Sequence, residues 1–124
     1  MHGGVQDQLI ELTLPELDSE MCDALRESID ETISILLSPE VDDALYLHLW
    51  RVHSISRDEA PYKLEILCSA LEQVFGRGSK IISKAIAKRF YTKLGLTFFD
   101  NPTLTLIDYV EEAKIKFGKG EDQP

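Results

Sequence analysis

Residues 17–39 read LDSEMCDALRESIDETISILLSP, and this stretch predicts a helical fold. An apolar residue recurs every four positions, with acidic residues between the repeats: Leu17, Met21, Leu25, Ile29, Ile33 and Leu37. That spacing keeps the apolar side chains on one slowly drifting face of an α-helix. Ser38 and Pro39 end the pattern, because serine caps a following helix and proline is tolerated in a first turn. We therefore expect helices over residues 17–37 and 39–53.

Glycine and proline divide the rest of the chain into further helical segments. Pro61 predicts the start of a third helix, and the glycines of residues 76–78 predict its end, since glycine accepts the left-handed conformation. Ser79 is then placed to cap a fourth helix, which Gly95 terminates. Residues 96–99 are extended in propensity but have no pairing partner, so we expect a connection there.

A fifth helix is expected after Thr105, because Thr105 and Asp108 have the spacing of a capping box. Together these segments predict an all-α fold, a single compact bundle of about five helices over residues 17–117. The two helices expected at its centre are the second and the third. Residues 1–16 are expected to form a flexible N-terminal lead, and residues 118–124 a disordered tail.

Composition agrees with one folded domain. The chain has 124 residues, of which 44% are hydrophobic and 28% are charged. No apolar run is long enough to span a bilayer, and no export signal opens the chain, so a cytoplasmic location is expected. Cys22 and Cys68 lack a CxxC spacing and are expected to be reduced, buried thiols.

Charge is distributed unevenly along the chain. The formal net charge is −9, and residues 1–50 contain twelve acidic residues against Arg26 as their single base. Residues 77–99 contain no acid and six bases: Arg77, Lys80, Lys84, Lys88, Arg89 and Lys93. The first three lysines of that set form one helical stripe. Arg89 and Lys93 lie nearer the apolar side and are expected to reach the carboxylates of helix 17–37.

Three interpretations of this basic patch remain open. The basic helix packs beside the acidic one and the charges neutralise each other, or the patch binds an acidic partner, or it binds nucleic acid. Nucleic acid would bind the basic segment from Gly76 to Lys93, because Phe75 to Lys80 resembles a helix-hairpin-helix element, in which a Gly-x-Gly turn directs backbone N–H groups at phosphate. An overall acidic chain opposes that interpretation, since it repels a polyanion everywhere else.

Helix 39–53 is apolar around nearly its whole circumference. One face carries Val41, Leu45, His48, Leu49 and Val52, and the other carries Tyr46, Leu47 and Trp50. Such a helix is either central in the fold or exposes a contact surface. In the first case His48 is a core histidine with a hydrogen-bond partner. In the second, Tyr46, Leu47 and Trp50 are the candidate interaction residues.

Catalytic chemistry finds little support in the sequence. A glycine-rich phosphate loop, a Gly-x-Ser-x-Gly elbow and a spaced set of metal ligands are all missing, so neither cofactor nor metal is expected. His48 and His53 are five residues apart and do not stack as a metal-binding pair. The adjacent acids Asp42 and Asp43 point in different directions on a helix and are expected to be solvated. An apolar small-molecule pocket lined by Tyr46, His48 and Tyr109 is a further hypothesis.

Four strings of the sequence carry a family resemblance. They are ALYLHL at 44–49, LEQVFGRG at 71–78, KRFYTKLGL at 88–96 and IDYV at 107–110. Over roughly residues 18–117 the chain resembles the small archaeal domain called Nitrosopumilus output domain five. The resemblance implies a helical module associated with signal-transduction proteins, a family without an established catalytic activity. We therefore expect a non-enzymatic output or interaction module that binds a protein partner or forms a homodimer, with nucleic-acid binding as the alternative.

Overall fold

The computed structural model describes residues 19–119, and every regular element in that range is helical. Their bounds are α2 (Ser19–Leu36), α3 (Pro39–His53), the 3-10 turn η1 (Ala60–Tyr62), α4 (Leu64–Phe75), the 3-10 turn η2 (Gly76–Gly78), α5 (Ser79–Leu94) and α6 (Leu106–Lys119). The predicted all-α fold is confirmed. The expected lead over residues 1–16 lies outside the described residues. The last helix ends at Lys119, two residues beyond its predicted end at residue 117. The rest of the expected tail also lies outside the described residues.

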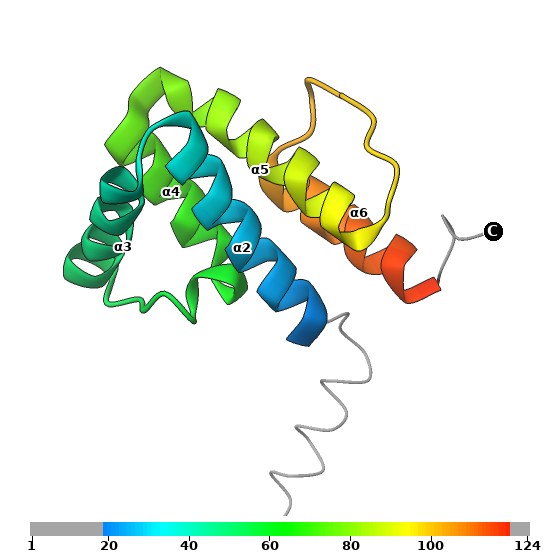
Figure 1. Cartoon of the computed structure of the whole chain (residues 1–124), viewed down its shortest axis with the longest axis horizontal. Coiled ribbons are helices and arrows are strands. Elements are labelled where there is room, and N and C mark those ends of the chain that lie inside the picture. Colours follow the sequence, from blue (N-terminus) through cyan, green and yellow to red (C-terminus); the bar gives the residue numbers. More distant parts are fainter. Residues whose placement is uncertain (1–18, 120–124) are drawn as a thin grey trace, which may run out of the picture.

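The largest helix contact is between α2 and α5, which run in opposite directions. Glu27 of α2 lies beside Lys93 at one end, and Leu36 lies near Ala85 at the other. Figure 1 shows α5 flanked by α2, α4 and α6, whereas α3 packs on α2 and α4 at one side. The expectation that the helix at 39–53 is central is therefore wrong, because α5 takes that place.

The α2 ladder behaves largely as its spacing predicts. Met21, Leu25, Ile29 and Ile33 are buried, and Leu17 lies outside the described residues. Leu37 is the exception, at 48% exposure. The helix ends at Leu36, and Ile35 and Leu36 before it are also exposed, so the buried face of α2 stops at Ile33.

Local capping signals fix most of the helix ends. The Ser38 hydroxyl accepts a hydrogen bond from the Val41 N–H at 3.1 Å, as expected for an N-cap. Thr105 and Asp108 form the predicted capping box, in which each backbone N–H donates to the other side chain, at 3.0 and 3.2 Å. Gly95 ends α5 with φ +74°, a left-handed conformation that glycine adopts without strain.

Two of the expected helix starts differ from the structure. Pro61 lies in η1, and α4 begins three residues later at Leu64. Ser79 is the first residue of α5 rather than its cap, and its side chain is buried. Both differences arise because a 3-10 turn, which the helical periodicity does not distinguish from an α-helix, precedes each helix.

Two tyrosines anchor the connection between α5 and α6. The buried Tyr91 hydroxyl donates to the Tyr109 carbonyl oxygen at 2.7 Å. The Tyr109 hydroxyl accepts from the Asn101 N–H at 2.8 Å and donates to the Phe99 carbonyl oxygen at 3.0 Å. The Phe98 ring stacks on the Tyr109 ring with centroids 4.9 Å apart. Residues 96–105 therefore have a fixed course although they form no helix.

Truncation inside the α2–α5 contact is expected to destabilise the fold. Ile86 is fully buried on α5, so Ile86→Ala should lower the free energy of unfolding by about 2–5 kcal/mol. Ile81 of the same helix is 72% exposed, and Ile81→Ala should change it by less than about 0.5 kcal/mol. Urea denaturation followed by circular dichroism measures both. Similar losses in the two variants would contradict the observed burial.

Candidate functional site

Half of the predicted basic patch is occupied by ion pairs within the domain. Arg89 lies 3.4 Å from Glu31, and Lys93 lies 3.1 Å from Glu31 and 3.4 Å from Glu27. The hydrogen bond to Glu31 is the main cause of the raised pKa of Lys93. These contacts confirm that the two residues reach the carboxylates of α2.

Lys84 is the third paired base. Its Nζ lies 2.7 Å from Asp100 Oδ1, and this hydrogen bond is the main cause of the raised pKa of Lys84. Asp100 comes from the connection after α5, and the pair ties that connection to the helix. The remaining bases of the patch, Arg77, Lys80 and Lys88, are exposed and form no ion pair with any residue from 19 to 119.

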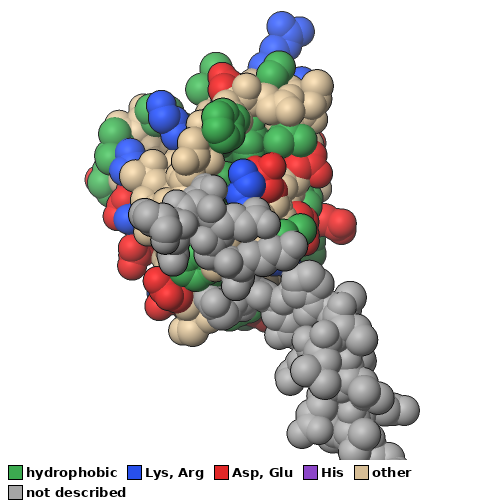
Figure 2. Space-filling view, turned by 90° about the vertical axis from the view of Figure 1, so that its right-hand side faces the viewer, with side chains coloured by type: hydrophobic (Ala, Val, Ile, Leu, Met, Phe, Trp, Pro, Cys, Tyr) green, Lys and Arg blue, Asp and Glu red, His purple; other side chains and the backbone are tan. Residues whose placement is uncertain are grey.

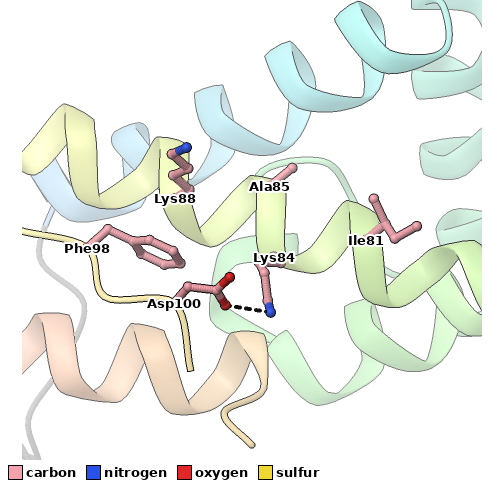
Figure 3. A pocket seen from close by; sticks show the side chains of 6 residues that line it. All are labelled: Ile81, Lys84, Ala85, Lys88, Phe98 and Asp100. Atoms are coloured by element: carbon pink, nitrogen blue, oxygen red, sulfur yellow. Dashed lines mark hydrogen bonds and ion pairs between the residues drawn. The ribbon is translucent and has the colours of Figure 1, made fainter. Parts of the chain in front are cut away.

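A hollow lies between α5 and the connection that follows it. Its volume is about 420 Å³, and the lining residues are Ile81, Lys84, Ala85, Lys88, Phe98 and Asp100. Figure 3 shows the Phe98 ring and Asp100 on one side, with the α5 residues along the other. The dashed contact between Lys84 and Asp100 closes part of the opening. Most of the exposed lining is therefore apolar, with the Lys88 ammonium at its edge.

A second hollow of about 350 Å³ lies on the opposite side of the same α5 residues. It is lined by Thr32, Ile35, Leu36, Ala85, Lys88, Arg89 and Thr92. Ala85 and Lys88 line both hollows, so they form a ridge between them. Ile35 and Ile81 are large apolar side chains left exposed beside this ridge. We call this region, from Lys80 to Arg89 with its two hollows, the α5 face.

Apolar side chains also reach the surface elsewhere. Figure 2 views the molecule from the side on which α6 and residues 96–105 lie, where hydrophobic patches stand among basic and acidic side chains. Phe99 and Ile115 are among the large apolar residues exposed in these segments. The α5 face differs from these patches because its apolar residues line two hollows that share Lys88, a base without an ion pair to any of residues 19–119.

The predicted contact surface on α3 is only partly present. Leu47 and Trp50 are exposed, Trp50 to 59%, and they share one side of the helix. Tyr46 is 7% exposed, which corrects its assignment as an interaction residue. Its ring is covered by the Arg57 guanidinium, whose carbon lies 3.9 Å from the ring centroid.

The hypothesis of a pocket lined by Tyr46, His48 and Tyr109 is wrong. The first two residues belong to α3 and the third to α6, and these helices do not pack against each other. Tyr109 is buried and anchors the connection after α5. His48 is only half-buried and lies outside the core, which corrects that part of its interpretation, but it does have a hydrogen-bond partner, since its Nε2 lies 2.8 Å from Gln73 Oε1.

The expectation that Asp42 is solvated is also wrong. Asp42 is 4% exposed, whereas the neighbouring Asp43 faces solvent. Arg57, from the connection after α3, lies 3.2 Å from Asp30, 3.2 Å from Asp43 and 3.5 Å from Asp42. Asp42 turns inward because its position on α3 faces Asp30 of α2. The acidic pattern of the sequence carried no signal for that contact.

Neither cysteine is arranged as a nucleophile. Cys22 is buried, Cys68 is half-buried, and neither forms a disulfide. Burial raises the pKa of the Cys68 thiol to about 11, so it remains protonated at neutral pH. Over residues 19–119, no group of three or more histidine, cysteine or acidic side chains is arranged to hold a metal ion. No helix in that range is both long and apolar enough to cross a membrane.

Several residues of the α5 face were not predicted from the sequence. Phe98 and Asp100 fell in a segment without helical periodicity, and Ile35 and Leu36 continue the apolar end of α2. The alternation of bases with Ile81 and Ala85 on the fourth helix was a usable signal. The other walls of the hollows come from segments distant in the sequence, and no pattern in those segments predicted the contact.

A double-mutant cycle tests how strongly the ion pairs hold the bases. Lys93→Met and Glu31→Gln, singly and together, should give a coupling energy of about 0.2–1 kcal/mol, because both side chains are partly exposed. The coupling should decrease in 1 M salt, which screens exposed charges. Lys80→Met is the control, with little effect on stability at either salt concentration. A coupling energy of zero at low salt would contradict an ion pair between Lys93 and Glu31 in solution.

Comparisons with known proteins add no relative to this description. No protein-family model matches the chain, and no curated protein or solved structure was found that matches it. The resemblance to Nitrosopumilus output domain five therefore remains a prediction from the sequence.

Proposed function

We propose that this chain is a non-enzymatic protein-interaction module that binds an acidic, partly apolar segment of a partner protein on the α5 face. The observation that carries the proposal is the position of Lys88, which lines both apolar hollows and forms no ion pair with any residue from 19 to 119, with Lys80 exposed two turns before it on the same helix. The sequence resemblance to Nitrosopumilus output domain five supports a role in signal-transduction output. In that role the module acts in the cytoplasm.

The α5 face favours a partner segment that has both apolar and acidic side chains. Apolar side chains of the partner would enter the hollows on either side of Ala85, which is small enough to allow close approach. Carboxylates would then pair with Lys80 and Lys88, which are separated by about 12 Å along the helix. The ion pairs between these lysines and the carboxylates orient the partner segment, whereas its buried apolar side chains contribute most of the affinity.

Carboxylates beside the α5 face favour a peptide partner over a nucleic acid. Glu31, Glu27 and Asp100 neutralise three of the six bases and add negative charge near the surface. A phosphate backbone needs several unpaired bases in a row to release its counterions. Within residues 19–119, three bases of the patch are left without an ion pair, whereas the sequence suggested six. They are Arg77, Lys80 and Lys88.

Selection from a displayed peptide library tests the proposal. The library contains 16-residue amphipathic peptides whose polar positions are either acidic or basic. Wild-type protein should enrich the acidic peptides, and the Lys80→Glu, Lys88→Glu double variant should weaken binding of an enriched peptide at least tenfold. Arg51→Glu, Lys63→Glu carries the same charge change away from α5 and should bind like wild type. Circular dichroism confirms that all the proteins are folded.

Two results would contradict the proposal. One is failure to enrich any acidic peptide, and the other is binding that the α5 and control variants weaken equally. If light scattering instead detects a dimer that Lys80→Glu, Lys88→Glu abolishes, the acidic partner is a second copy of this chain.

The second candidate function is nucleic-acid binding by the segment from Gly76 to Lys93. It is favoured by one observation: Gly76, at φ +57°, begins a turn that leads Arg77 and Lys80 to the start of α5, where no side chain caps the helix. Backbone N–H groups at such a helix start attract phosphate.

A salt titration against single- and double-stranded oligonucleotides separates this candidate from the first. Binding through phosphate contacts should weaken steeply between 50 and 200 mM salt and be lost in Arg77→Glu, Lys80→Glu. Arg77→Glu alone should weaken oligonucleotide binding and leave the binding of an acidic peptide unchanged, because the peptide pairs with Lys80 and Lys88. The absence of any oligonucleotide binding at 50 mM salt would exclude the candidate.

A further inference from the structure

Three carboxylates and one guanidinium meet where α2, α3 and the connection after α3 come together. Arg57 contacts Asp30 of α2 and Asp42 and Asp43 of α3, and it stacks on the Tyr46 ring. The formal charge of this cluster is −2 when every carboxyl is ionised, so one guanidinium does not neutralise it. This cluster lies where α2 packs on α3. The proposed function uses a different surface, the α5 face.

Asp42 and Tyr46 are buried with unsatisfied polar atoms. Neither Asp42 Oδ1 nor the Tyr46 hydroxyl has a hydrogen-bond partner within the described part of the chain. A buried polar atom without a hydrogen bond destabilises the folded state, so each of them requires an explanation. Two ionised carboxylates cannot satisfy each other, because both only accept hydrogen bonds. A proton retained on Asp42 would turn its carboxyl into a hydrogen-bond donor, and the Asp30 carboxylate, which contacts the same Arg57 nitrogen, is an acceptor nearby.

The electrostatic environment of Asp42 agrees with this arrangement. Burial raises the pKa of Asp42 to about 7, and the neighbouring Asp30 carboxylate acts in the same direction. Arg57 lowers the pKa of Asp42 but does not compensate. Burial, followed by the charge of Asp30, also raises the pKa of Tyr46, so its hydroxyl stays protonated and takes no part in the titration.

We propose that Asp30 and Asp42 form a proton-binding site that holds α3 against α2, and that release of the shared proton near neutral pH weakens this contact. The groups that face the proton are Asp30 from α2, Asp43 and Tyr46 from α3, and Arg57 from the connection. After release, two buried carboxylates repel each other under a single guanidinium. Movement of the start of α3 that brings Asp42 towards water then lowers the free energy of the protein.

The sign of the effect on stability follows from proton linkage. Between about pH 4 and pH 7 the folded chain binds a proton at Asp42 that the unfolded chain has already lost. The contribution of Asp42 to stability is therefore fully present below about pH 4. It is lost progressively as the pH rises to about 7.

Urea unfolding of wild type and Asp42→Asn from pH 5 to pH 8 tests the site. Trp50 fluorescence reports on α3 itself, because Trp50 is the single tryptophan of the chain and lies on that helix. Between about pH 5 and 6.5, the unfolding equilibrium constant of wild type should rise nearly tenfold per pH unit relative to that of the variant. Asp43→Asn removes an exposed carboxylate from the same guanidinium, and it should keep the pH dependence of wild type.

Carbon-13 NMR of the wild-type protein gives a second measurement that does not depend on the variant folding. The side-chain carboxyl carbon of Asp42 should titrate with a midpoint near 7. A midpoint below about 5 would overturn the proposal. A ratio of unfolding constants that stays flat from pH 5 to pH 8 would overturn it as well.

Discussion

The packing of α2 against α5 is the contact on which the rest of the molecule depends. Ile29 and Ile33 of α2 and Ile86 and Phe90 of α5 are fully buried, and burial of such side chains stabilises a fold by about 1.5–3 kcal/mol each. The ion pairs beside this contact are partly exposed and contribute far less. The apolar residues therefore set the register of the two helices. That register in turn decides which carboxylates meet which bases, and so which bases remain unpaired on the α5 face.

Patterns that depend on neighbours in sequence predicted the structure well. The four-residue repeat in α2, the Ser38 cap, the capping box at Thr105 and the glycine at 95 all act within one or two helical turns, and each has the predicted consequence. Asp42 and Tyr46 illustrate the opposite case. Their burial depends on Asp30 and Arg57, which lie 12 and 15 residues from Asp42 in the sequence and meet it only after α2 and α3 pack. An acidic pair on a helix gives no indication of such a partner.

The sequence predicted one part of the candidate site and missed another. The bases of α5 could be identified from the sequence, and the pairing of Arg89 and Lys93 followed from their position near the apolar side. The hollows could not, because each has one wall from another segment. Phe98 and Asp100 reach α5 only because Tyr109 holds residues 96–105 in place through backbone hydrogen bonds. Side-chain contacts of an irregular connection have no periodicity from which to predict them.

The distribution of charge gives the α5 face a further property. The chain carries a net charge of −9, so an acidic partner is repelled by most of the molecule and attracted only near the unpaired bases. Repulsion elsewhere orients the partner during its approach, and salt that screens this field slows association more than it changes the final contacts. Neutralisation of Lys84, Arg89 and Lys93 by neighbouring carboxylates narrows the attractive region to one side of α5. The acidic surface thus acts together with the few exposed bases, because a small attractive region on a repulsive molecule discriminates between orientations better than a uniformly basic surface would.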